Sequence, residues 1–117
     1  MRKAIALSGV AAAALLLAGC RSTPPSKPLS QLTPTEMQGY LVYQSHCSTC
    51  HYANRSGALH GPSLHGLFKR RYLPSGAPAN DDRVRSTILH GRNMMPPFGN
   101  TLDDQQIRDL IAYLHTI

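Results

Sequence analysis

Two cysteines and a histidine stand together near the middle of the chain, in the run Cys47-Ser48-Thr49-Cys50-His51. Thiols three residues apart can add to the two vinyl groups of one haem and form two thioethers. A histidine directly after the second cysteine can then ligate the haem iron from one face. The motif therefore predicts one covalently bound haem c, attached through Cys47 and Cys50, with His51 as the proximal iron ligand.

Three other uses of these residues compete with haem. A thioredoxin-like redox pair is typical of a strand–helix context, and this chain shows no βαβ pattern. A zinc site could draw on Cys47, Cys50, His46 and His51, but a second ligand pair at finger-like spacing is missing. A structural disulfide would leave His51 without a role. Haem is the use that accounts for all three residues of the motif without a second ligand pair.

The sixth position of the iron has several candidate ligands downstream of the motif, namely His60, His65, His90, Met94 and Met95. Met95 precedes Pro96, and a residue before proline is biased to extended backbone, which suits a loop that presents a thioether to iron. We therefore predict Met95 as the sixth ligand, with Met94, a histidine or an open site as alternatives. A thioether prefers ferrous iron, so His/Met ligation would raise the reduction potential.

The start of the sequence has the features of an export signal. Arg2 and Lys3 are followed by a mainly apolar run over residues 4–18, which is too short for a comfortable transmembrane span. The run Leu17-Ala18-Gly19-Cys20 resembles a bacterial lipobox, in which the cysteine becomes the first mature residue and carries a diacylglycerol. We predict a signal peptide over residues 1–19 and lipidation at Cys20; an ordinary signal peptide or an uncleaved anchor are the alternatives.

Export bears on both location and cysteine chemistry. A lipidated Cys20 would hold the protein on the periplasmic side of a bacterial membrane, and Arg21 in place of a retention Asp favours the outer membrane. Two nearby cysteines in an oxidising compartment usually pair unless something else consumes them. Covalent haem at Cys47 and Cys50 would do so, which strengthens the haem prediction.

Size and charge exclude several classes of function. The chain has 117 residues, no Trp and two Phe, which is enough for one small domain with a thin core, so a central cofactor is plausible. Twelve basic residues against six acidic ones give a formal charge of +6, which falls by two when Arg2 and Lys3 leave with the signal peptide. The basic residues form no dense block, so nucleic acid is not an expected partner.

The remaining sequence divides into a tether and a helical domain. Residues 20–34 are rich in Pro and Ser, which predicts an extended tether that spaces the domain from the membrane. The domain is expected over residues 35–117. A first helix is expected from about Thr35 to Ser45, a loop with at most one helical turn over residues 52–80, and a short helix from Asp81 to His90.

The clearest helix is the last one. Asp103 is a good N-cap, and Gln106 can complete a reciprocal capping box. The helix carries an apolar stripe at 3.6-residue spacing, formed by Ile107, Leu110, Ile111 and Leu114. Because no segment shows convincing strand alternation, the predicted fold class is all-α.

These features together resemble the class I cytochromes c. The resemblance rests on Gly39-x-x-x-Tyr43-x-x-x-Cys47-x-x-Cys50-His51, Gly61-Pro62-Ser63-Leu64-His65-Gly66-Leu67-Phe68, Met95-Pro96-Pro97-Phe98, and Leu110-x-x-Tyr113-Leu114, which cover residues 36–115 in order. It implies a small fold of three to four helices around one haem, with the N- and C-terminal helices crossing where Gly39 and Tyr43 meet Leu110 and Tyr113.

The resemblance also implies roles for further residues. The backbone carbonyl of Pro62 would accept a hydrogen bond from the second ring nitrogen of His51. Arg70, and less clearly Arg71, would contact a haem propionate, or else Lys69, Arg70 and Arg71 form a solvated basic surface.

The expected function is single-electron transfer between redox proteins such as a dehydrogenase, oxidase or reductase, rather than catalysis. The alternatives are a haem subunit of such a complex, an enzyme with an open iron site, and a gas or redox sensor. A bound Met95 thioether would separate the carrier from the last two, because it closes the iron to ligands.

Overall fold

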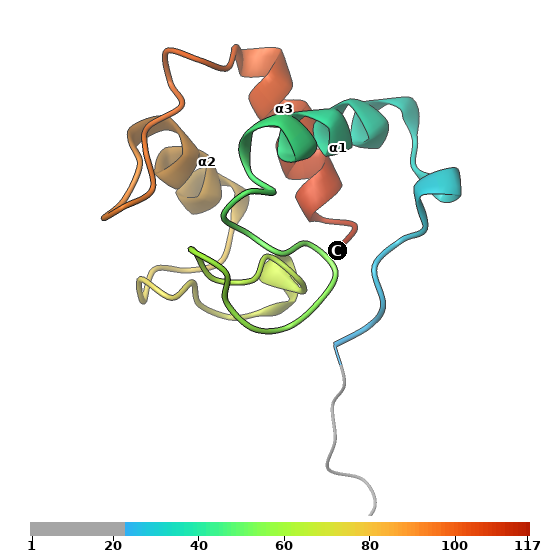
Figure 1. The fold of residues 1–117 in the computed structure, drawn as a ribbon, viewed down its shortest axis with the longest axis horizontal. Helices are drawn as coiled ribbons and strands as arrows, with labels where there is room; N and C mark the ends of the chain where they lie inside the picture. Colours follow the sequence, from blue (N-terminus) through green and yellow to red (C-terminus); the bar gives the residue numbers. More distant parts are fainter. Residues whose placement is uncertain (1–22) are drawn as a thin grey trace, which may run out of the picture.

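The computed structural model describes residues 23–117, which form helices joined by long loops (Figure 1). The helices are α1 (Pro34–His46), α2 (Asp81–His90) and α3 (Asp104–Leu114), with short 3-10 turns η1 (Leu29–Gln31) and η2 (Leu67–Lys69). Within residues 23–117 there is no strand, only two isolated bridges, Tyr72 with Pro78 and Arg92 with Met95. The all-α prediction is confirmed. None of the helices in this part of the chain is long and apolar enough to cross a membrane.

Helix α1 begins at a capping box. The Thr33 hydroxyl accepts a hydrogen bond from the backbone N–H of Glu36, and the Glu36 carboxylate accepts one from the Thr33 N–H at 2.7 Å. Pro34 fills the first helical position, where a missing N–H has no cost. The helix therefore extends one residue beyond the expected Thr35–Ser45 at each end, and it delivers Cys47 directly after its last turn.

Helix α3 forms as its capping pattern predicts. Asp103 and Gln106 make the reciprocal capping box, with bonds of 2.8 and 2.9 Å. Its apolar stripe is the centre of the core, and Ile107 and Leu110 are almost completely buried. α2 also has the expected bounds, with Asn80 as the N-cap and Val84 and Ile88 facing the core.

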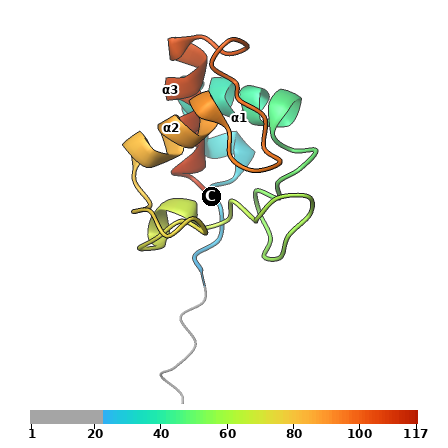
Figure 2. The ribbon, with the colours of Figure 1, turned by 90° about the vertical axis from the view of Figure 1, so that its left-hand side faces the viewer.

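Helices α1 and α3 cross in close contact, as both views show (Figures 1 and 2). Gly39 lies against the backbone of Asp109, and a Cβ on Gly39 would stand only 2.8 Å from Cβ of Tyr113. The ring of Tyr113 lies 5.5 Å from the rings of both Tyr40 and Tyr43. The crossing of the first and last helices is thus built from one glycine and three tyrosines whose rings meet edge-on or tilted.

Gly39→Ala should destabilise the protein, although alanine favours an isolated helix by about 1 kcal/mol over glycine. The added methyl group would overlap the Asp109 backbone, and overpacking of this kind costs about 1–3 kcal/mol. Urea unfolding of the holoprotein measures the change. Gln38→Ala, at an exposed position on the same helix, is the control and should change stability little. A more stable Gly39→Ala protein would contradict the close crossing.

Residues 23–33 lie along the domain, and we call them the strap. The Lys27 N–H donates to the Thr116 carbonyl at 2.8 Å, and the Lys27 ammonium pairs with Glu36 at 2.7 Å. The segment expected to be a spacer is therefore fastened to the domain from Thr23 onward. Residues 1–22, which include the expected signal peptide and Cys20, lie outside the described residues.

Candidate functional site

The Cys-x-x-Cys-His motif forms a tight turn at the end of α1. Cys47 is the C-cap, and its N–H donates to the Tyr43 carbonyl at 2.8 Å. The N–H groups of Cys50 and His51 both donate to the Cys47 carbonyl, at 3.0 and 2.9 Å. These bonds hold the two cysteines and the histidine in one compact turn. Both thiols are free and half-buried.

Cys47 lies in an apolar setting that disfavours charge. Burial, and to a smaller extent the nearby Cys50, raise the pKa of the Cys47 thiol to about 11. Because thiolates are the nucleophiles and metal ligands among cysteines, this thiol is a poor candidate for a redox pair or a zinc site in the folded domain. The same burial suits an uncharged thioether.

His51 is held by one hydrogen bond to the following loop and one to helix α1. Its Nδ1 lies 2.7 Å from the carbonyl oxygen of Pro62, and its own carbonyl accepts a bond of 2.8 Å from the Tyr43 hydroxyl. A carbonyl can only accept, so the proton of the neutral imidazole is on Nδ1 and the lone pair is on Nε2. A lone pair on Nε2 is what an iron ligand needs, and such a second partner fixes the ring orientation. The histidine therefore fits the proximal role.

Gly61 lies against the imidazole ring of His51, a contact that the sequence pattern did not reveal. A Cβ on Gly61 would stand 2.8 Å from Nδ1 and 3.0 Å from Nε2 of His51. The Gly61 N–H also donates to the Cys50 carbonyl at 2.8 Å, which closes the loop onto the motif. Only glycine allows the loop and the ring to lie this close.

Gly61→Ala should displace the His51 ring and weaken its bond to Pro62. We expect a shifted reduction potential and a loss of stability of about 1–3 kcal/mol, the usual cost of overpacking. Potentiometry and urea unfolding measure the two effects.

Gly57→Ala is the matched control for Gly61→Ala. Gly57 lies in the same loop with φ +94°, and a Cβ there meets nothing within 4 Å. The control should lose stability through backbone strain while leaving the potential unchanged. Equal potentials in Gly61→Ala and the wild type would contradict the proposed contact.

The loop after α2 separates the two methionines. A tight turn pairs Arg92 with Met95 through bonds of 3.0 and 2.9 Å, and Asn93 adopts φ 53° within it. Met94, at the tip, is 93% exposed, whereas Met95 is half-buried and packs against the core. Of the two methionines, Met95 is the one that faces the interior of the domain.

The histidines considered as sixth ligands are at the surface or engaged elsewhere. His60 is exposed. Nε2 of His65 lies 3.1 Å from the Pro24 carbonyl, and Nδ1 of His90 lies 3.0 Å from the Ser86 carbonyl. The His46 ring, a candidate in the zinc alternative, stacks edge-on against Phe98 at 5.9 Å. In residues 23–117 no three His, Cys, Asp or Glu side chains gather as a metal site.

Arg70 braces the loop that carries Pro62. Its guanidinium donates to the carbonyls of Ser63 and His65, at 3.2 and 2.8 Å. Its charge has no carboxylate partner in the described part of the chain, which leaves it available to an anion such as a propionate.

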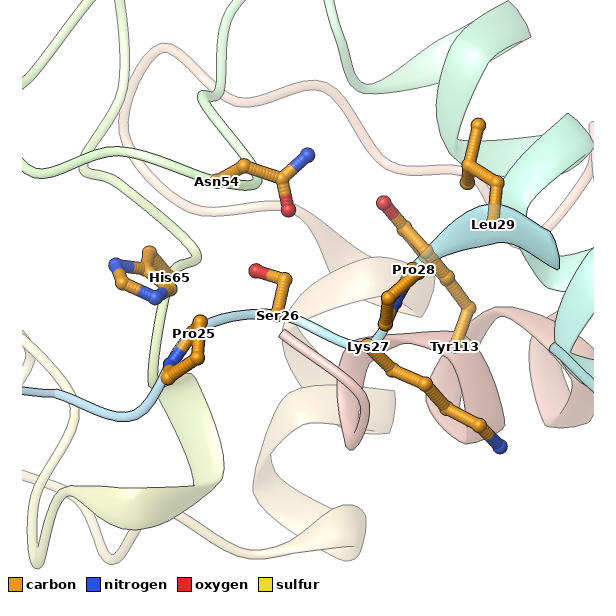
Figure 3. A pocket seen from close by; sticks show the side chains of 8 residues that line it. All are labelled: Pro25, Ser26, Lys27, Pro28, Leu29, Asn54, His65 and Tyr113. Carbon is orange, nitrogen blue, oxygen red and sulfur yellow. The ribbon is translucent and has the colours of Figure 1, made fainter. Parts of the chain in front are cut away.

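A separate hollow lies under the strap. Its volume is about 500 Å³, and it is bordered by strap residues Pro25 to Leu29 together with Asn54, His65 and Tyr113 (Figure 3). Of the residues considered for haem binding, only His65, an alternative sixth ligand, borders it. The hollow therefore belongs to the docking of the strap and not to the motif.

Known proteins with similar sequences are c-type cytochromes. Residues 34–114 match the family described as cytochrome C oxidase, cbb3-type, subunit III. A cytochrome c-555 of Methylococcus capsulatus is 32% identical over 114 residues, 96% of this chain and 84% of the relative. A cytochrome c6 of Thermosynechococcus vestitus is 29% identical over 91 residues, 74% of this chain and 78% of the relative.

A solved structure shares the fold. It is the cytochrome c6 of the diatom Phaeodactylum tricornutum, with a TM-score of 0.54 and 22% identity, and the match covers 68% of this chain and 88% of that one.

Proposed function

The chain belongs to the class I c-type cytochromes, and we propose that it carries single electrons between redox proteins as a His/Met-ligated cytochrome anchored to a membrane by lipid. As a member of this family it is an electron carrier with one covalently attached haem c. The iron ligands, the lipid anchor and the redox partners are proposals.

The observation that carries the ligation proposal is the bond between His51 and Pro62. With the proton of the ring held on Nδ1, Nε2 presents its lone pair beside Cys47 and Cys50, which supply the two thioethers. Met95, half-buried on its turn, would supply the second protein ligand of the iron. When bound, the haem iron supplies a ferric/ferrous one-electron couple.

The surrounding residues hold the side chains that would ligate the iron in fixed positions. Pro62 and Gly61 fix the His51 ring, and the Phe98 N–H anchors the methionine loop to the Ile88 carbonyl at 2.9 Å. Arg70, held by the 63–65 carbonyls, offers positive charge to a propionate. Ligands that do not move with oxidation state keep the reorganisation small, which favours fast electron transfer.

We also propose that Cys20 is lipidated after removal of residues 1–19, on the periplasmic side of a bacterial membrane. The lipobox-like run before Cys20 supports this, and Arg21 favours the outer membrane. Two or three acyl chains, at about 0.8 kcal/mol per buried methylene, anchor a protein stably. Dehydrogenases, oxidases or reductases at the same membrane are the proposed electron donors and acceptors.

Cys20→Ser tests the anchor. We expect the variant to keep its haem but to move from the membrane to the soluble fraction, because no acyl chain can be attached. Haem-stained denaturing gels of the two fractions measure this. Ser22→Ala is the control and should remain in the membrane fraction. A Cys20→Ser protein that stays fully membrane-bound would contradict lipidation.

A further inference from the structure

The strap leaves the domain at one defined place. The methyl group of Thr23 lies over Gly66, and His65 Nε2 donates to the Pro24 carbonyl at 3.1 Å. Figures 1 and 2 both show the start of the strap near the loop over residues 55–78. This end of the molecule lies opposite the start of α3. The position of residue 23 is therefore fixed relative to the whole domain.

Only a short stretch of chain separates this exit from the proposed anchor. Cys20 precedes Thr23 by three residues, and three Cα steps of 3.8 Å span at most about 11 Å. This step rests on the proposed lipidation of Cys20. With the acyl chains inserted, the Cα of Thr23 lies within about 11 Å of the Cα of Cys20 at the membrane surface, and the 65–66 loop packs against Thr23. This reach is comparable to the Debye length of about 10 Å at 0.1 M salt.

A basic ridge, Lys69–Tyr72, adjoins the exit. Lys69, Arg71 and Tyr72 are exposed, and the Arg70 guanidinium ties the ridge to the exit through the His65 carbonyl. Arg71 lies 5.7 Å from the centre of the Tyr72 ring, which is 54% exposed.

The charge of the ridge is not neutralised by side chains of the described residues. The three ion pairs among residues 23–117 involve other residues, and Lys69 donates to the Ile117 main-chain oxygen at 3.3 Å. The sequence has no acidic residue between Glu36 and Asp81. The ridge therefore places three positive charges and an amphipathic aromatic ring beside the anchor point.

We propose that the basic ridge docks on anionic lipid headgroups and thereby holds the anchored cytochrome in one orientation. Basic residues within a Debye length of an anionic leaflet are attracted to it, each strengthening binding about fivefold. Tyrosine is enriched at the membrane–water interface because its ring is apolar and its hydroxyl is wet. The docked domain lies with the ridge against the membrane and the start of α3 directed away from it.

The first test separates the ridge from the anchor. Full-length Cys20→Ser holoprotein is mixed with neutral phosphatidylcholine vesicles or with vesicles that contain phosphatidylglycerol, and bound protein is measured by sedimentation. We expect salt-sensitive binding to the anionic vesicles only. Adding the pair Lys69→Gln and Arg71→Gln should weaken this binding roughly twentyfold. The control pair is Arg83→Gln with Arg108→Gln, which removes the same charge from α2 and α3. The control pair should weaken the binding much less.

The second test measures orientation in the lipidated protein. A single cysteine is introduced as Ser75→Cys near the ridge or as Thr101→Cys before α3, and its reaction rate with a bulky polymer maleimide is compared in the two kinds of vesicle. We expect slow labelling at residue 75 in anionic vesicles, relieved by Lys69→Gln with Arg71→Gln, and unhindered labelling at residue 101.

The outcomes distinguish the ridge from the anchor. The intact mass of the protein reports whether Cys20 carries lipid. A missing lipid would overturn the proposed lipidation, whereas the sedimentation test would still measure lipid binding by the ridge. Equal weakening by the two charge-matched pairs would overturn the ridge as a lipid-binding surface. The proposal would also be overturned if Lys69→Gln with Arg71→Gln slowed electron transfer to an acidic redox protein and left vesicle binding intact.

Discussion

Replacing both motif cysteines, Cys47→Ala with Cys50→Ala, should abolish covalent haem attachment completely. Each single variant can retain at most one thioether, so its haem content should fall strongly. A second consequence is loss of the fold, because a chain with no Trp and two Phe has too thin a core to stand without the group at its centre. Haem-stained denaturing gels and intact mass measure both the attachment and the yield.

Thr49→Ala is the matched control for the cysteine variants. Thr49 is exposed in the same turn between the two cysteines, so its loss leaves both thiols and His51 in place. The control should bind haem as the wild type does. Haem that survives denaturation in the double cysteine variant would contradict attachment at this motif.

Met95→Ala should change the iron site more than any other single replacement outside the motif. Loss of the thioether should abolish the weak near-infrared sulfur-to-iron band of the oxidised protein and open the reduced iron to carbon monoxide. Because axial ligands set haem potentials over a range of about 0.8 V, the potential should fall by on the order of a hundred millivolts or more. Absorption spectra, carbon monoxide titration and potentiometry measure the three effects.

Met94→Ala provides the comparison. Its side chain is almost fully exposed at the tip of the Arg92–Met95 turn, so the variant should keep the band and the potential. Loss of the band in Met94→Ala alone would exchange the two assignments, and loss in neither would direct attention to the histidines. Rapid carbon monoxide binding by the wild type would favour an open-site enzyme or sensor.

Local patterns in the sequence predict the helices well. The reciprocal bonds of Thr33 with Glu36 and of Asp103 with Gln106 connect residues three positions apart, so their chemistry can be recognised without knowing the fold. The crossing of α1 and α3 was expected from the resemblance to class I cytochromes c, which pairs Gly39 and Tyr43 with Leu110 and Tyr113. The cysteine motif is local as well.

Contacts between distant segments were harder to predict. The approach of Gly61 to the His51 ring depends on how the loop closes, and no periodicity records it. The docking of the strap depends largely on two main-chain groups, the Pro24 carbonyl and the Lys27 N–H, which the pattern of side chains does not mark. A Pro- and Ser-rich composition therefore suggested a free tether, whereas tertiary hydrogen bonds decide where residues 23–33 lie.

A redox titration of the purified full-length holoprotein, followed at the haem absorption bands, tests the central claim most directly. One haem per chain, bound by thioethers to Cys47 and Cys50, predicts a single reversible transition with a slope of about 59 mV per tenfold change, the value for one electron. The haem should also resist extraction by acidified solvent. A two-electron slope, an irreversible transition or extractable haem would contradict a single-electron carrier built on this motif.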